Sequence, residues 1–117
     1  MPRKKRPALY HPHHTWDDKW HALDYHGQIV IFFERAGLAK ALNRTPHAIR
    51  AMEQKGIICK PKIRLPKYPH PWLYTESQIL AMMQLAEEEG VLNPNYRKPF
   101  SKRFINEAHG ILSQMPG

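Results

Sequence analysis

The apolar positions in the middle of the chain repeat with the period of an α-helix and predict two short helices joined by a tight turn. The first spans about residues 36–42, and the second runs from Pro46 to about Lys55. Thr45 is a good N-cap for the second helix, and Pro46 suits its first position because proline has no N–H to leave unpaired. Gly56 ends this helix. The facing apolar residues are Leu38, Ala39, Leu42, Ile49 and Met52.

Residues 57–74 predict a β-hairpin with a long loop. The segment holds four prolines and alternates short apolar and basic stretches. We expect Ile57–Cys59 to form the outgoing strand and Trp72–Tyr74 the returning strand. This hairpin carries four cations, Lys60, Lys62, Arg64 and Lys67.

A helix and a strand are predicted before this central unit. Trp16, Trp20 and Leu23 recur at i, i+4 and i+7, the spacing of a short amphipathic helix, which would end near Gly27. Residues 28–33 are β-branched and aromatic, which favours a strand.

Two further helices are predicted after the hairpin. Thr75 and Gln78 have the spacing of a capping box, and the helix that they begin runs to about Glu89. Gly90 stops it, and Ser101 caps a last helix. The sequence therefore predicts an α+β, mostly helical fold: a flexible basic and histidine-rich arm (1–14), then a single domain (15–117) whose C-terminal helices lie within 76–114.

Positive charge is concentrated in one part of the chain. The net charge is +8, and residues 28–75 carry nine Lys or Arg and two Glu, whereas the segments on either side are close to neutral. A local basic field of this kind attracts a polyanion, of which DNA and RNA are the usual examples. A solubilising surface is the alternative explanation.

Several classes of protein are disfavoured by composition. Cys59 is the single cysteine, which excludes an internal disulfide framework and fits a reducing, intracellular environment. No apolar run approaches the roughly 20 residues that cross a bilayer. We also find no serine nucleophile elbow, phosphate-binding glycine loop or marked pair of carboxylates, so we expect neither an enzyme nor a cofactor.

The order of these elements, helix, turn, helix and basic hairpin, predicts a winged helix-turn-helix over about residues 36–75, with the wing at 57–74. The central sequence resembles the MerR-type DNA-binding domain, including the variants found in small bacteriophage proteins such as excisionases and small terminase subunits. The stretches that carry the resemblance are Leu38-Ala39-Lys40-Ala41-Leu42, Thr45-Pro46-His47-Ala48-Ile49-Arg50, Glu53-Gln54-Lys55-Gly56-Ile57-Ile58 and Leu73-Tyr74-Thr75-Glu76.

The sequence also departs from that family. Gly90 and Pro94 interrupt the region where MerR regulators continue into a long dimerisation helix. Trp72 replaces the arginine that commonly precedes the Leu-Tyr pair of the wing. The resemblance therefore implies the DNA-binding role without the effector-sensing role.

The predicted function is the binding of double-stranded DNA by the helix at 46–55 and the basic wing. The resemblance implies that Arg50 contacts a phosphate, and Arg44 could form a bidentate pair with guanine. Thr45 is better explained as a cap than as a base contact. The full set of candidate DNA-binding residues is Arg44, Thr45, His47, Arg50, Gln54, Lys55, Lys60, Lys62, Arg64 and Lys67.

Other signals are weaker. His11, His13 and His14 have irregular spacing for a zinc site, and we expect no metal. The terminal run Arg3–Arg6 is either a DNA-contacting arm or a solvated tail. Trp16 and Trp20 more often mark a packing face than a base-stacking one.

We therefore expect a transcription regulator, or a phage accessory protein for recombination or packaging, in the cytoplasm of a bacterial or phage-infected cell. The alternative is a structural or interaction protein of a virion or complex that uses the same fold for protein contacts. A homodimer or a protein partner would then dock through the N-terminal aromatic helix or the C-terminal helix. A metal-dependent nuclease is a third, weaker hypothesis.

Overall fold

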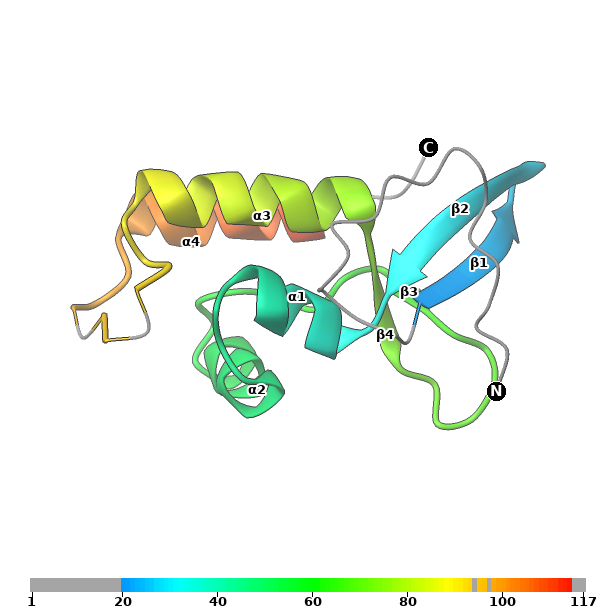
Figure 1. Cartoon of the computed structure of the whole chain (residues 1–117), viewed down its shortest axis with the longest axis horizontal. Coiled ribbons are helices and arrows are strands. Elements are labelled where there is room, and N and C mark those ends of the chain that lie inside the picture. Colours follow the sequence, from blue (N-terminus) through cyan, green and yellow to red (C-terminus); the bar gives the residue numbers. More distant parts are fainter. Residues whose placement is uncertain (1–19, 94, 97, 115–117) are drawn as a thin grey trace.

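The computed structural model describes residues 20–93, 95–96 and 98–114 (Figure 1). Within them, four helices and a four-stranded antiparallel sheet form a small α+β fold, which confirms the predicted class. In chain order the elements are β1 (Trp20–Tyr25), β2 (Gln28–Phe33), α1 (Arg35–Ala41), α2 (Pro46–Gln54), β3 (Ile63–Arg64), β4 (Trp72–Thr75), α3 (Glu76–Glu88) and α4 (Lys102–Leu112).

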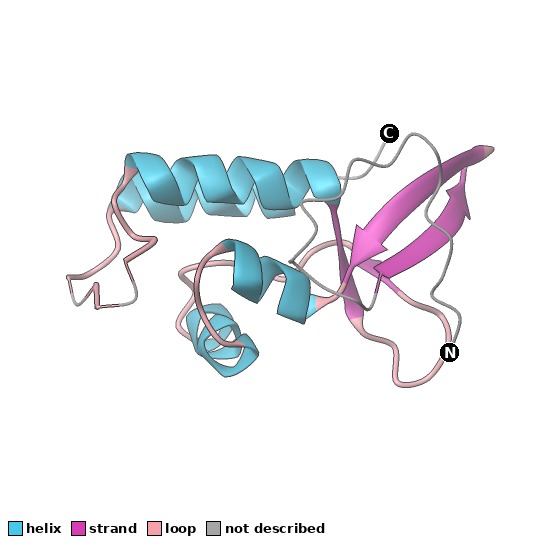
Figure 2. Ribbon diagram, in the orientation of Figure 1, coloured by secondary structure: helices cyan, strands magenta, loops and turns pink. Residues whose placement is uncertain are grey.

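The sheet joins two hairpins that lie on opposite sides of α1 and α2 in the sequence. Its strand order is β1-β2-β4-β3. The two hairpins meet where Phe32 pairs with Thr75 and Phe33 pairs with Tyr74. This order places β1 at one edge of the curled sheet. Figure 2 shows the β1–β2 hairpin extending away from the helices.

The predicted N-terminal helix is wrong over the residues that the structure describes, because Trp20–Tyr25 is a strand paired with β2. The strand reverses at His26 and Gly27, whose φ angles of 53° and 82° meet the requirement of a type I′ hairpin turn. The Asp24 carboxylate accepts a hydrogen bond from the Gly27 N–H at 3.0 Å and so closes the turn. Trp16 and the predicted arm at 1–14 lie outside the described residues.

The predicted ends of the helices agree with the structure. Asn43, Gly56 and Gly90 follow α1, α2 and α3 with φ angles of 57°, 75° and 72°. These three helices each end with the pair of backbone hydrogen bonds of a Schellman motif. At the end of α2, for example, the Ile57 N–H donates to the Met52 carbonyl at 3.0 Å.

This closure explains why the outgoing strand of the β3–β4 hairpin was predicted wrongly. We expected Ile57–Cys59, but the strand that pairs with β4 is Ile63–Arg64. The N–H groups of Ile57 and Ile58 already bond the Met52 carbonyl, so they are not available to a sheet. Ile58 is buried in the core, which holds this segment beneath α2.

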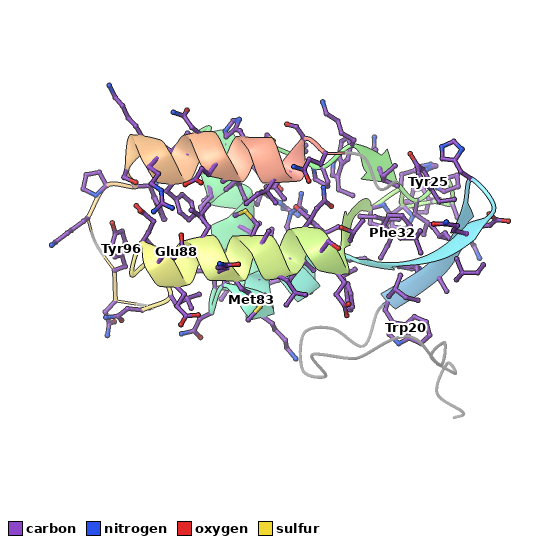
Figure 3. The ribbon with its side chains drawn as sticks, turned by 90° about the horizontal axis from the view of Figure 1, so that it is seen from above. Trp20, Tyr25, Phe32, Met83, Glu88 and Tyr96 are labelled. Atoms are coloured by element: carbon purple, nitrogen blue, oxygen red, sulfur yellow. The ribbon has the colours of Figure 1, made fainter. Side chains whose placement is uncertain are left out.

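The core lies between the α1–α2 pair and the α3–α4 pair. Thr75 and Gln78 form the predicted capping box, and the Ser101 hydroxyl caps α4 through the Phe104 N–H at 3.0 Å. Figure 3 shows α3 and α4 side by side, with Glu88 near one end of the pair and Phe32 beyond the other. The fully buried residues at the centre include Leu38, Ile49, Tyr74, Ile79 and Phe104.

Candidate nucleic-acid interface

The start of α2 is fixed by Thr45, and its first turn faces solvent. The Thr45 hydroxyl accepts a hydrogen bond from the Ala48 N–H at 3.1 Å, while Pro46 occupies the first helical position. Thr45 therefore serves as the N-cap, in line with the sequence interpretation. His47, one residue further along, is exposed and makes no hydrogen bond or ion pair with a residue that the structure describes.

Arg44 is held against the protein itself. Its guanidinium donates to the carbonyls of Leu42 and Asn43 at 3.2 and 3.3 Å, and also to the carbonyl of Val91 in the loop after α3. A cation at the carbonyl end of α1 is favoured by the helix dipole. The structure thus gives Arg44 a role in joining the α1–α2 turn to the loop after α3.

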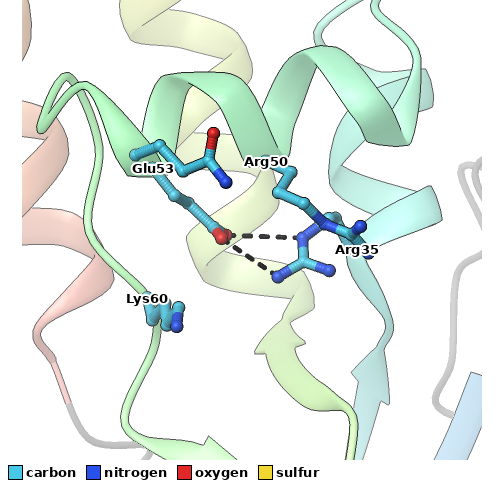
Figure 4. Close-up of a pocket in the computed structure, with 5 residues that line it drawn as sticks. Arg35, Arg50, Glu53 and Lys60 are labelled. Atoms are coloured by element: carbon cyan, nitrogen blue, oxygen red, sulfur yellow. Dashed lines mark hydrogen bonds and ion pairs between the residues drawn. The ribbon is translucent and has the colours of Figure 1, made fainter.

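An open hollow of about 420 Å³ lies beside the second half of α2 (Figure 4). Its lining combines residues from the start of α1, from α2 and from the segment that leads to β3. Three of the five side chains are cations. The lining residues are Arg35, Arg50, Glu53, Gln54 and Lys60.

Glu53 is neutralised within this hollow by Arg35. The Arg35 guanidinium lies 3.0 Å from one carboxylate oxygen of Glu53, and the Tyr74 hydroxyl donates to the other at 3.2 Å. The Glu53 side chain is only 4% exposed, so this carboxylate is enclosed by its partners. Burial, followed by the nearby Glu53 carboxylate, raises the pKa of Tyr74, which keeps its hydroxyl protonated as a donor.

Arg50 remains available to a ligand. Glu53, three residues further along α2, is an obvious candidate partner for Arg50, but it pairs with Arg35 instead. The exposed Arg50 makes no hydrogen bond or ion pair within the described part of the chain. Figure 4 shows Arg50 and Arg35 from neighbouring helices on the same side of the hollow, with Lys60 across from them.

The remaining predicted cations lie along α2 and the β3–β4 hairpin. Lys60 and Arg64 both approach the ring of Trp72, with Lys60 Nζ at 5.6 Å and Arg64 Cζ at 4.6 Å from its centre. Trp72 thus lies against two cations of the hairpin region. The other predicted residues, Gln54, Lys55, Lys62 and Lys67, are all exposed.

One arginine outside the candidate site, in contrast, is fully paired. Arg103 on α4 contacts the carboxylates of Glu88, Glu89 and Glu107 at 3.0, 3.0 and 2.7 Å. Of the three consecutive glutamates at the end of α3, Glu88 and Glu89 are therefore ion-paired. Residues 44–75 carry seven Lys or Arg and one acidic residue, Glu53, so positive charge is in excess on α2 and the hairpin.

The sequence did not single out Arg35, and it suggested Arg50 as the possible partner of Glu53 where the structure has Arg35. The pair joins residues 18 positions apart, a separation for which the sequence carries no periodic signal. Among the described residues, no group of three or more histidine, cysteine or acidic side chains could hold a metal ion. In the same part of the chain, no helix has the length and apolar character to cross a bilayer.

Comparisons with known proteins add no relationship. The chain matches no protein-family model, no curated protein sequence and no solved structure.

Proposed function

We propose that the protein is a winged helix-turn-helix that binds double-stranded DNA. In this arrangement α1 supports α2, α2 enters the major groove by its N-terminal half, and the β3–β4 hairpin is the wing that follows the phosphate backbone. The element order and the exposed, capped start of α2 support the proposal.

The observation that carries the proposal is the contrast between Arg50 and Arg103. Arg50 lies with Lys60 at an open hollow, and Arg35 satisfies the one carboxylate there. Arg103 instead forms ion pairs with Glu88, Glu89 and Glu107. Cations without internal partners are the ones that can displace counterions from DNA, which provides most non-specific affinity.

The test is the binding of fluorescently labelled, mixed-sequence duplex DNA measured by anisotropy over a range of salt concentrations. We expect affinity to fall steeply with salt. Arg50→Ala should weaken binding by about 1–3 kcal/mol if Arg50 supplies a specific contact, or lower the salt slope by about 1 if it contacts a phosphate. Lys102→Ala is the matched control, because it removes an exposed cation from the first position of α4.

Two results would overturn the proposal. One is salt-independent or absent binding by the wild-type protein. The other is an equal loss of affinity in the Arg50 and Lys102 variants, which would show that net charge alone matters. Selection of bound duplexes from a random pool then separates specific from non-specific binding, as a transcription regulator or a phage recombination or packaging accessory requires.

A second candidate function is that of a protein-binding component of a virion or other complex. The exposed Ile29 favours it, since this side chain is 64% exposed on the hairpin that extends from the helices. Light scattering after size exclusion, in the absence of nucleic acid, tests this alternative through the mass of the particle.

A further inference from the structure

The loop between β3 and β4 presents a large aromatic side chain to solvent. Tyr68 is 84% exposed, the highest value among the exposed large hydrophobic residues of the described structure. Its neighbours Pro66, Lys67 and Pro69 are exposed as well. The tip of the loop is therefore an apolar projection that carries one cation.

Hydrogen bonds within the loop hold its shape. The Leu65 N–H donates to the Pro71 carbonyl at 2.9 Å, and the His70 N–H donates to the Lys67 carbonyl at 2.8 Å. The His70 ring lies edge-on to the Tyr68 ring, with centres 6.2 Å apart. Prolines at 66, 69 and 71 further restrict the chain.

The base of the loop is fixed from the sheet. Arg64 donates from Nε to the His70 carbonyl at 3.0 Å while its guanidinium covers the Trp72 ring. Arg64 therefore positions the loop, and Lys67 is the cation nearest in sequence to Tyr68. An exposed apolar residue on a surface is ordinary by itself. When the loop around such a residue is already ordered, however, binding through that residue costs little conformational entropy.

The loop and α2 extend toward the same side of the molecule. In Figure 1 α2 lies below α1, and the loop extends to the right of and below β4, whereas α3 and α4 lie above. If α2 occupies a major groove, a wing beside it reaches the flanking backbone and the adjacent minor groove, as extended arms do in other DNA-binding domains. Apolar side chains inserted there unstack a base step and bend the duplex.

We infer that Tyr68 is a minor-groove wedge, which the ordered 65–71 loop inserts between base pairs next to the α2 site. The inference rests on the proposed DNA-binding function and adds a mode of contact and a deformation of the DNA. Lys67 would pair with a phosphate at the groove edge, and the Tyr68 ring would supply the apolar and stacking contact.

The experiment compares wild type, Tyr68→Ala, Tyr68→Phe and Ile29→Ala on a mixed-sequence duplex with a donor and an acceptor dye at its ends. Anisotropy gives the affinity, energy transfer between the dyes gives the bend, and netropsin competes for the minor groove. Ile29→Ala is the control because it removes another exposed apolar side chain from a different hairpin. Thermal unfolding confirms that each variant is folded.

We expect Tyr68→Ala to weaken binding about tenfold or more, to remove the energy-transfer change and to make binding insensitive to netropsin. Tyr68→Phe and Ile29→Ala should match wild type in all three measurements. Wild-type affinity, bending and netropsin sensitivity in Tyr68→Ala would overturn the wedge while leaving the DNA-binding function in place. Absence of salt-dependent binding by the wild type would overturn the proposed function itself, and the wedge with it.

Discussion

Arg35, the first residue of α1, and Glu53, in the last turn of α2, form an ion pair of 3.0 Å across the helix pair. The contact is reinforced by the Tyr74 hydroxyl of β4, which bonds the same carboxylate. Three elements thus meet at one buried acidic group. This contact sets how α2 sits on α1 and the sheet, and it leaves Arg50 on the outer side of α2 without a competing carboxylate.

Glu53→Ala should lower the free energy of unfolding by about 1–3 kcal/mol, because it removes the acceptor of the buried Tyr74 hydroxyl and leaves Arg35 without its counter-charge. Urea unfolding followed by circular dichroism measures the change. Glu87→Ala, an exposed glutamate of α3, is the control and should change stability by less than about 0.5 kcal/mol. Equal effects of the two substitutions would show that the cluster at Glu53 contributes nothing.

Arg44→Ala should destabilise the fold by about 1–2 kcal/mol, because three carbonyls lose a charged hydrogen-bond donor. Measured well below its melting temperature, the variant should keep more DNA affinity than Arg50→Ala. The sequence interpretation, a bidentate contact between Arg44 and guanine, makes the opposite prediction. Unchanged stability together with lost affinity for selected DNA would support that contact instead.

Thr45→Ala should cost about 1 kcal/mol of stability through loss of the α2 cap. Thr45→Ser keeps the hydroxyl and should restore most of it. Thermal unfolding distinguishes the two variants. If Thr45→Ser is as unstable as Thr45→Ala, the contribution comes from the methyl group of Thr45 and the capping explanation is wrong.

The parts of the fold that sequence predicted well depend on local chemistry. The caps at Thr45, Thr75 and Ser101 and the helix stops at Gly56 and Gly90 involve neighbours within a few positions, so the pattern contains the information. The helical period failed at Trp20 because it rested on only three apolar positions, and pairing of Trp20–Tyr25 with Gln28–Phe33 across a two-residue turn overrides it. The His26-Gly27 turn was the contrary signal, although His is a weaker marker of this turn than Asn or Asp.

Contacts between distant segments could not be predicted. The strand that pairs with β4 is Ile63–Arg64 and not Ile57–Cys59, because the N–H groups of Ile57 and Ile58 bond the end of α2 and Ile58 is buried in the core. The same holds for the candidate site. The exposure of Arg50 could be predicted from its place on the polar face of α2. That Arg50 is not paired with Glu53 could not, because it depends on the ion pair between Arg35 and Glu53, which forms only in the folded chain.

The contacts of the Glu89 carboxylate with Ser101 and Arg103 can be tested through the pH dependence of stability. A hydrogen bond from the Ser101 hydroxyl, and then one from Arg103, lowers the pKa of Glu89 below its ordinary value. Because the folded protein favours the ionised form, this group contributes stability at pH values above its ordinary pKa. That contribution is lost as pH falls through the lowered pKa of the folded state.

Glu89→Gln should therefore have a lower melting temperature than wild type at pH 7, and the difference should shrink as the pH falls below the ordinary range of a glutamate. Differential scanning calorimetry at several pH values measures it. Glu87→Gln is the matched control, since Glu87 has no hydrogen bond or ion pair with a described residue and should show no comparable convergence. A Glu89→Gln deficit that is constant with pH would mean that the side chain acts through packing, and that the ionised carboxylate does not join α3 to α4.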